Sequence, residues 1–136
     1  RTGMNIVVIS LNPDMRVRLE EIVSAAGFLS ISVADIQTAI VSVSPEKPSL
    51  MLVDLDSDKA DLPALRRLKR VLSQSKLIGL SVQNYHPHLK EAVQSGIFTA
   101  LVKAPFEEEL TYWINSLMAC PESFESVSAL SGQTNS

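Results

Sequence analysis

The chain has 136 residues, which suits one compact domain, and its hydrophobic residues (46%) include few aromatic ones (5%), so we expect an aliphatic core. The net charge of −3 gives no support for nucleic-acid binding by the domain as a whole, and no apolar run is long enough to span a bilayer. The single cysteine, Cys120, excludes an intramolecular disulfide and fits a reducing compartment. We therefore expect a cytoplasmic domain that contacts neither nucleic acid nor membrane.

Apolar runs alternate with helical patterns along the chain. The apolar runs predict five strands, at residues 4–9, 29–34, 50–54, 77–82 and 99–103. The helical patterns predict five helices, at residues 13–26, 35–44, 61–72, 89–95 and 106–118. Pro13, Gly27 and Asp35 support the boundaries, since they suit a first helical turn, a helix end and an N-cap. We expect a domain over residues 4–119 and a polar, serine-rich tail or linker over 120–136 that leads into an effector.

The alternation of strands and helices predicts the fold class. Continuously apolar strands joined by helices are typical of a parallel sheet that is covered on both faces. Right-handed crossovers leave few topologies, and the leading one is the flavodoxin-like, doubly wound α/β fold with strand order 2-1-3-4-5. In that order, the carboxyl ends of the first, third, fourth and fifth strands meet at one edge of the sheet.

Polar side chains stand where these strands end. Asp54 and Lys103 close the third and fifth predicted strands, Ser81 ends the apolar run 77–80 of the fourth, and Ser10 follows the first. Open α/β sheets place their sites at this edge. We therefore expect Asp54, Ser81 and Lys103 to cluster, with the Lys103 ammonium as the counter-charge of a partly buried Asp54 carboxylate.

The order and spacing of three segments resemble the receiver domains of two-component response regulators. These segments are Pro48–Asp54, Ile78–Ser81 and Leu101–Phe106, and the resemblance covers residues 4 to about 119. It implies that Asp54 is the phosphoacceptor, Ser81 the switch hydroxyl and Lys103 the phosphate-binding lysine. It also implies a signalling module that works with a histidine kinase, an effector domain or a second copy of itself as a homodimer, and that is not an enzyme.

The chain departs from the family where the family binds Mg²⁺. Ser10 and Leu11 stand in place of the acidic pair that follows the first strand, so the anionic ligands of a hard cation are missing. In-line phosphoryl transfer relies on that metal. Asp56 and Asp58, just past Asp54, offer partial compensation. We expect no metal site and impaired phosphorylation.

Further departures concern the switch. Val82 replaces the small residue that follows the switch hydroxyl in the family, and Ala100 replaces its switch aromatic residue. Ala104 interrupts the Lys-Pro pair that often carries a cis peptide bond in receivers. These features predict a degenerate receiver, or pseudo-receiver, that holds one conformation.

Three other features lie outside this site; the basic run among them is a solvated face by default, with an acidic partner as the alternative. Tyr112 and Trp113 lie toward the flank of the last helix and are interface candidates. The basic run 66–70 forms the outer face of the third helix, with Leu65, Leu68, Val71 and Leu72 predicted to point inward. His86 and His88 flank a proline but lack a third ligand nearby, so a turn is the default for them.

Three functions remain open at this stage. The first is a signalling module that acts through protein contacts without Mg²⁺-dependent phosphorylation. The second is a conventional receiver that accepts phosphate on Asp54, in which case Mg²⁺ is its cofactor. The third is a flavodoxin-like domain that binds a small ligand at the strand ends, which only the topology supports, since the loop from Ser10 to Asp14 lacks the glycines of a phosphate loop.

Overall fold

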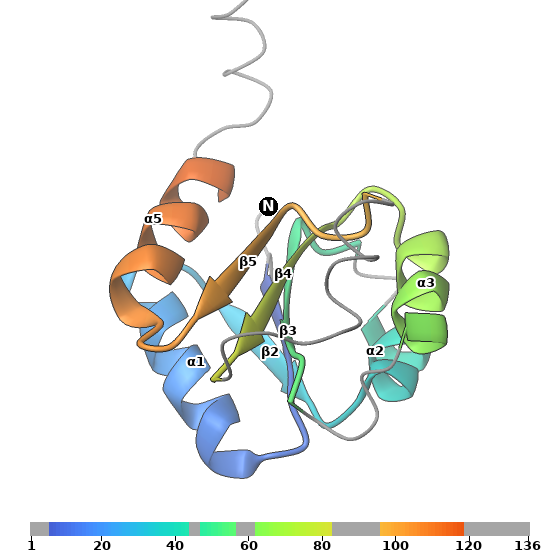
Figure 1. Ribbon diagram of the computed structural model, residues 1–136, viewed down its shortest axis with the longest axis horizontal. Coiled ribbons are helices and arrows are strands. Elements are labelled where there is room, and N and C mark those ends of the chain that lie inside the picture. Colours follow the sequence, from blue (N-terminus) through green and yellow to red (C-terminus); the bar gives the residue numbers. More distant parts are fainter. Residues whose placement is uncertain (1–5, 44–46, 57–61, 83–95, 119–136) are drawn as a thin grey trace, which may run out of the picture.

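Five parallel strands form one sheet (Figure 1). The structure is a computed structural model that describes residues 6–43, 47–56, 62–82 and 96–118. The strands are β1 (Ile6–Ile9), β2 (Ser30–Val33), β3 (Leu50–Asp54), β4 (Lys76–Ser81) and β5 (Ala100–Lys103). Their order is β2-β1-β3-β4-β5, and every neighbouring pair is parallel. The predicted flavodoxin-like topology is confirmed.

Helices cover both faces of the sheet. They are α1 (Pro13–Ala25), α2 (Ile36–Val43), α3 (Leu62–Val71) and α5 (Glu107–Met118). Figure 1 shows α1 and α5 on one face of the sheet and α2 and α3 on the other. The helix predicted at residues 89–95 lies outside the described residues, as do Asp58, His86, His88, Cys120 and the predicted tail.

The helix boundaries have local causes in the sequence. The Asn12 side chain accepts hydrogen bonds from the N–H groups of Asp14 and Met15 at 2.9 and 3.4 Å, which caps α1. At the other end, Gly27 has a φ of +94°, and the Phe28 N–H reaches the Val23 carbonyl at 3.1 Å. Asp35 caps α2, as predicted, by accepting from the Thr38 N–H at 2.8 Å.

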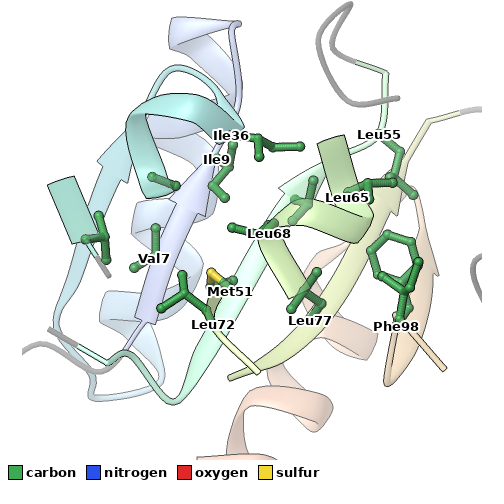
Figure 2. Packing of buried hydrophobic residues seen from close by; sticks show 14 residues of the cluster. Val7, Ile9, Ile36, Met51, Leu55, Leu65, Leu68, Leu72, Leu77 and Phe98 are labelled. Carbon is green, nitrogen blue, oxygen red and sulfur yellow. The ribbon is translucent and has the colours of Figure 1, made fainter. Parts of the chain in front are cut away.

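Aliphatic side chains fill the space on both faces of the sheet. One cluster of buried residues joins the sheet to α2 and α3; Figure 2 shows Leu65, Leu68 and Leu72 packed over Met51 and Leu77. The other joins the sheet to α1 and α5 through residues such as Leu19, Ile22, Leu110 and Ile114. Every residue of β3 is buried, as expected of a central strand in a doubly covered parallel sheet.

One inward-pointing residue was predicted wrongly. Val71 is the last residue of α3 and is 45% exposed, whereas Leu65, Leu68 and Leu72 are buried. Successive helical residues are rotated by about 100°, so Val71 falls on the flank of the helix once its neighbour Leu72 faces the core. An apolar side chain is thereby left on the surface beside the basic residues of α3.

Candidate functional site

The predicted site residues lie at one edge of the sheet. Ser10 follows β1, while Asp54, Ser81 and Lys103 are the last residues of β3, β4 and β5. The strand register places Asp54 beside Leu80 and Ser81 beside Lys103. Because the four strands are neighbours and run in the same direction, their carboxyl ends bring these residues together, as the topology predicted.

Asp54 is buried and already hydrogen-bonded through both carboxylate oxygens. Asp54 is only 4% exposed. Its Oδ2 accepts a hydrogen bond from the Ser10 hydroxyl at 2.7 Å, and its Oδ1 accepts one from the Asp56 N–H at 3.0 Å. A buried carboxylate needs such donors, because desolvation without them is costly.

Ser10 is itself held in place by its surroundings. It is fully buried, and its backbone N–H donates to the Val33 carbonyl of β2 at 3.1 Å. The Ser10 hydroxyl oxygen accepts from the Asn12 N–H at 3.0 Å, and its carbonyl accepts from Arg16 Nη1 at 2.6 Å. Of the two acceptors within reach of the Ser10 hydroxyl, Asp54 Oδ2 at 2.7 Å is much closer than the Asn12 carbonyl at 3.4 Å. Ser10 is therefore a structural partner of the acid at a position where receivers place a metal ligand.

Asp56 uses both of its carboxylate oxygens at the end of β4. Oδ1 accepts from the Ser81 hydroxyl at 2.9 Å, and Oδ2 accepts from the Val82 N–H at 2.8 Å. The Ser81 hydroxyl is thus directed to Asp56 in this structure. From the sequence, Asp56 was expected only as a substitute metal ligand. Its position two residues after Asp54 placed it near the site but did not predict its hydrogen bonds with Ser81 and Val82.

Lys103 and the turn after it complete the edge. Lys103 is exposed, and the proximity of its ammonium to Asp54 stays a prediction. The Ala104 N–H donates to the Ser81 carbonyl at 3.1 Å, which continues the pairing of β4 with β5 beyond the strand end. A cis peptide bond joins Ala104 to Pro105, so the turn contains a cis proline despite the inserted alanine.

The residues present do not fit a receiver-type Mg²⁺ site. Leu11 is 37% exposed and has no ligand atom in its side chain, and the Ser10 hydroxyl is a neutral group engaged with Asp54. The Asp56 oxygens accept from Ser81 and Val82. Within the described ranges, no group of three or more His, Cys, Asp or Glu side chains is placed to hold a metal ion. A hard divalent cation prefers several anionic oxygens that are open to it, whereas the two carboxylates described at this edge, Asp54 and Asp56, already accept hydrogen bonds from protein donors.

An open cavity of about 440 Å³ adjoins the site. It lies between α1, the end of β4 and the turn after β5, and its lining is Met15, Arg18, Val82, Ala104, Pro105 and Phe106. Val82 is 59% exposed there. Val82 thus contributes an apolar wall beside the strand ends.

The predicted interface residues, Tyr112 and Trp113, are neighbours on α5 and differ in exposure. Tyr112 is 62% exposed, and its ring meets the Trp113 ring edge-on, with centroids 5.5 Å apart and an interplanar angle of 74°. Trp113 is half-buried against the core, and its Nε1–H donates to Glu109 Oε2 at 3.4 Å. Tyr112 is therefore the exposed member of the pair.

Comparison with known structures identifies the fold as that of receiver domains. A signal receiver domain of an HD domain-containing protein from Pseudomonas fluorescens superimposes with a TM-score of 0.77 at 15% identity, over 90% of this chain and 99% of that one. A response regulator from Thermotoga maritima gives 0.73 at 18% identity, over 87% and 99%. A candidate pilus assembly protein from Burkholderia thailandensis gives 0.71 at 20% identity, over 86% and 99%.

No protein-family model matches the chain, and no curated protein matches it. Across the described ranges, no helix is both long enough and apolar enough to cross a membrane. At these identities the structural similarity establishes the fold, and the function has to be argued from the site.

Proposed function

We propose that this chain is a receiver-like signalling module that acts through protein contacts, with Mg²⁺-dependent phosphorylation of Asp54 impaired. It is a cytoplasmic, non-catalytic domain in this proposal. Its partners are a histidine kinase, an effector joined through residues 120–136, or a second copy of itself. The structural similarity to receiver domains supports the module type, while the impairment is inferred from the residues of the site.

The hydrogen bond from Ser10 to Asp54 carries the proposal. A phosphoacceptor carboxylate needs a divalent cation beside it to neutralise charge on the transferred phosphoryl group. Here a neutral hydroxyl, 2.7 Å from Oδ2, satisfies the acid instead. Leu11 adds no ligand, so the chain stabilises the unmodified carboxylate and gives little stabilisation to the charged transition state.

The contacts of Ser81 support a fixed conformation. In a switching receiver the hydroxyl must turn toward the phosphoryl group, but here it donates to Asp56 at 2.9 Å. Ala100 provides no ring to move in response. Since an input acts only through a difference in affinity between two states, a module without the second state works through a constant surface, and we place that surface around Tyr112 and Trp113.

The similar structures suggest two settings for such a module. Response regulators are one, and the Burkholderia thailandensis structure, described as a candidate pilus assembly protein, is the other. Both are consistent with a domain that positions a partner and performs no chemistry of its own.

A conventional phosphorylatable receiver is the second candidate. The shared edge of Asp54, Ser81 and Lys103 favours it, and it requires Asp56 or water to take the place of the missing acids. The cavity beside Val82 gives the third candidate, a small-ligand site, a place to bind.

Titration with Mg²⁺ and beryllofluoride distinguishes these candidates. We expect no saturable binding of Mg²⁺ with beryllofluoride to the wild type, read from backbone amide chemical shifts. Shifts at Asp54 and across β5 and α5 that vanish in Asp54→Asn would show a working receiver and refute the proposal. A small molecule that changes the amide chemical shifts of Val82 and Phe106 equally in the wild type and in Asp54→Asn would support the third candidate.

A further inference from the structure

Basic side chains are concentrated on α3 and at the start of β4. Residues 62–82 contain five lysines and arginines and no acidic residue. Arg66, Arg67 and Arg70 are exposed on α3, on the side opposite its buried leucines. We call Arg66, Arg67, Arg70 and Val71 the basic face. Lys47 extends it, since Lys47 and Val71 line the same cavity of about 220 Å³.

Two further basic residues, Lys69 and Lys76, lie close enough to repel each other. Burial lowers the pKa of the Lys69 ammonium, and repulsion by Lys76 lowers it further. The ammonium donates to the Ser75 carbonyl at 2.9 Å. Lys69 and Lys76 therefore add positive charge beside the basic face without belonging to it.

Acidic side chains are concentrated on the opposite layer. The helices α1 and α5 pack against each other and contain six acidic residues and only two basic ones. Asp14 and Glu21 are exposed on α1, and Glu108 is exposed on α5. The basic Arg16 donates to the Ser10 carbonyl, which draws its charge toward the site. Arg18 is exposed one turn from Asp14 and from Glu21, so the acids of α1 are partly offset and Glu107, Glu108 and Glu109 of α5 contribute most of the excess negative charge. We call Asp14, Val17, Glu21, Glu108 and Tyr112 the acidic face.

Each face has exposed apolar side chains among its charges. Val71 is 45% exposed on the basic face, and Val17 and Tyr112 are 53% and 62% exposed on the acidic face. Spacings of three or four residues place Val17 between Asp14 and Glu21, and place Tyr112 one turn after Glu108. The two faces thus match in kind, with opposite charges around apolar contacts.

We propose that this chain self-associates head to tail, with the basic face of one copy docked on the acidic face of the next. The two faces lie on opposite sides of the sheet (Figure 1), so each copy can use both at once. Such a heterologous contact repeats and forms open chains of copies when the rotation does not close a ring. The inference deepens the proposed function, because it names the partner of the constant surface, but it does not depend on the state of Asp54.

A second copy fits the basic face better than a polyanion does. The chain carries a net charge of −3, and a nucleic acid or an anionic membrane would repel the acidic layer. A copy of the chain instead offers acids, a tyrosine and a valine on one surface. Since the charges are exposed, the contact is sensitive to salt, with a screening length of about 10 Å at about 0.1 M.

Charge reversal on each face provides the test. Sedimentation velocity of the 136-residue chain is measured over a range of concentrations at about 20 mM and about 300 mM salt. The first variant is R67E/R70E, and the second is E21K/E108K. We expect concentration-dependent association of the wild type at low salt, its loss at high salt, and association weakened at least about tenfold in either variant.

Two controls separate pairing of the faces from effects of net charge or folding. An equimolar mixture of R67E/R70E and E21K/E108K should associate, because each variant keeps one native face and carries one reversed face that suits the other variant. The quadruple variant keeps the wild-type net charge of −3 and should also associate, because both of its faces are reversed. Circular dichroism checks that each variant is folded.

Several outcomes would overturn the inference. A wild type that stays monomeric at low salt would do so, as would a mixture or quadruple variant that stays monomeric while folded. Binding of the wild type to anionic vesicles or to an oligonucleotide without self-association would assign the basic face to a different partner. None of these results alters the Mg²⁺ and beryllofluoride titration at Asp54, so the two proposals fail separately.

Discussion

The Ser10 hydroxyl donates a 2.7 Å hydrogen bond to the Asp54 carboxylate across the boundary between β1 and β3. Both residues are buried, so the bond is shielded from water and each group depends on the other. A hydroxyl donates a hydrogen bond to the carboxylate, whereas an acidic pair at this position would repel it unless a cation lay between them. Serine at position 10, where receivers carry an acidic residue, therefore removes a metal ligand and also contributes to the stability of the fold.

The first prediction concerns this bond. Ser10→Ala removes one hydrogen-bond donor of the buried Asp54 carboxylate. We expect the free energy of unfolding to fall by about 1.5–3 kcal/mol, the range for losing a hydrogen bond to a charged group. Urea denaturation measures it. Ser24→Ala, at an exposed position of α1, is the matched control and should change stability by no more than about 0.5 kcal/mol; equal effects of the two substitutions would contradict the prediction.

The second prediction restores the missing acids. S10D/L11D places like charges beside Asp54, so we expect the variant to be less stable than the wild type in EDTA. Mg²⁺ should then raise its melting temperature, because a ligand that binds only the folded state stabilises it by mass action. The wild type and S10D/L11D/D54N should show no such rise. If Mg²⁺ does not change the melting temperature of S10D/L11D, other residues, such as Val82, also block the site.

The third prediction concerns the packing of Gly79 in β4. A Cβ at this position would lie 2.6 Å from Leu55 Cδ1 and 2.8 Å from Leu101 Cδ2, both inside normal contact distance. We expect Gly79→Ala to lower the free energy of unfolding by about 1–3 kcal/mol through overpacking. Leu101→Ala should recover part of this loss by making room.

Gly27 provides the control for that pair. A Cβ at Gly27 would meet nothing within 4 Å, but its φ of +94° strains any other residue. Gly27→Ala should therefore destabilise the fold without being rescued by Leu101→Ala. Additive effects of Gly79→Ala and Leu101→Ala in a double-mutant cycle would show that Gly79 is not limited by this contact.

The fold and the place of the site could be predicted from the sequence because they depend on pattern. Buried parallel strands have continuous apolar runs, and the handedness of their crossovers restricts the topology. Once the strand order follows, the ends of β3, β4 and β5 must meet, which brings Asp54, Ser81 and Lys103 to one edge. None of these steps requires the orientation of a side chain.

The hydrogen bonds of the site could not be predicted in this way. Whether the hydroxyl of Ser81 faces Asp54 or Asp56 depends on a rotamer and on the path of the chain after β3. Val71 was predicted to point inward because valine is apolar, although its position at the end of α3 leaves it exposed. Sequence pattern specifies which residues share a region, and packing decides which of them touch.

The fourth prediction concerns pH. The pKa of Lys69 is lowered from 10.5 by burial and by Lys76, so above the lowered pKa the unfolded chain binds more protons at this residue than the folded chain. The free energy of unfolding should then rise with pH in the window between the lowered pKa and 10.5. Urea denaturation of wild type and Lys69→Met across this window isolates the contribution. A difference between the two proteins that is flat with pH would argue against it.

The last prediction concerns Asp56, whose carboxylate holds the end of β4. Its two oxygens accept from the Ser81 hydroxyl and the Val82 N–H at 2.9 and 2.8 Å. Asp56→Asn keeps the shape but removes the negative charge, and the Ser81 hydroxyl must then reverse to accept from the amide, so both bonds lose their charge-assisted character. We expect a loss of about 1–2 kcal/mol in unfolding free energy and faster hydrogen exchange of the Val82 amide. Asp56→Ala removes both acceptors and should accelerate this exchange further.

Exposed Asp14 at the start of α1 provides the matched control. Asp14→Asn makes the same chemical change without a partner in β4, so the Val82 amide should exchange as in the wild type. If Asp56 is what keeps Ser81 turned from Asp54, Asp56→Ala should also change the Ser81 side-chain chemical shifts toward those of a hydroxyl in a new environment. Val82 exchange and Ser81 shifts that are identical in the wild type and Asp56→Ala would show that the end of β4 is held by its backbone pairing with β3 and β5. The fixed conformation of the module would then have to be explained by Ala100 alone.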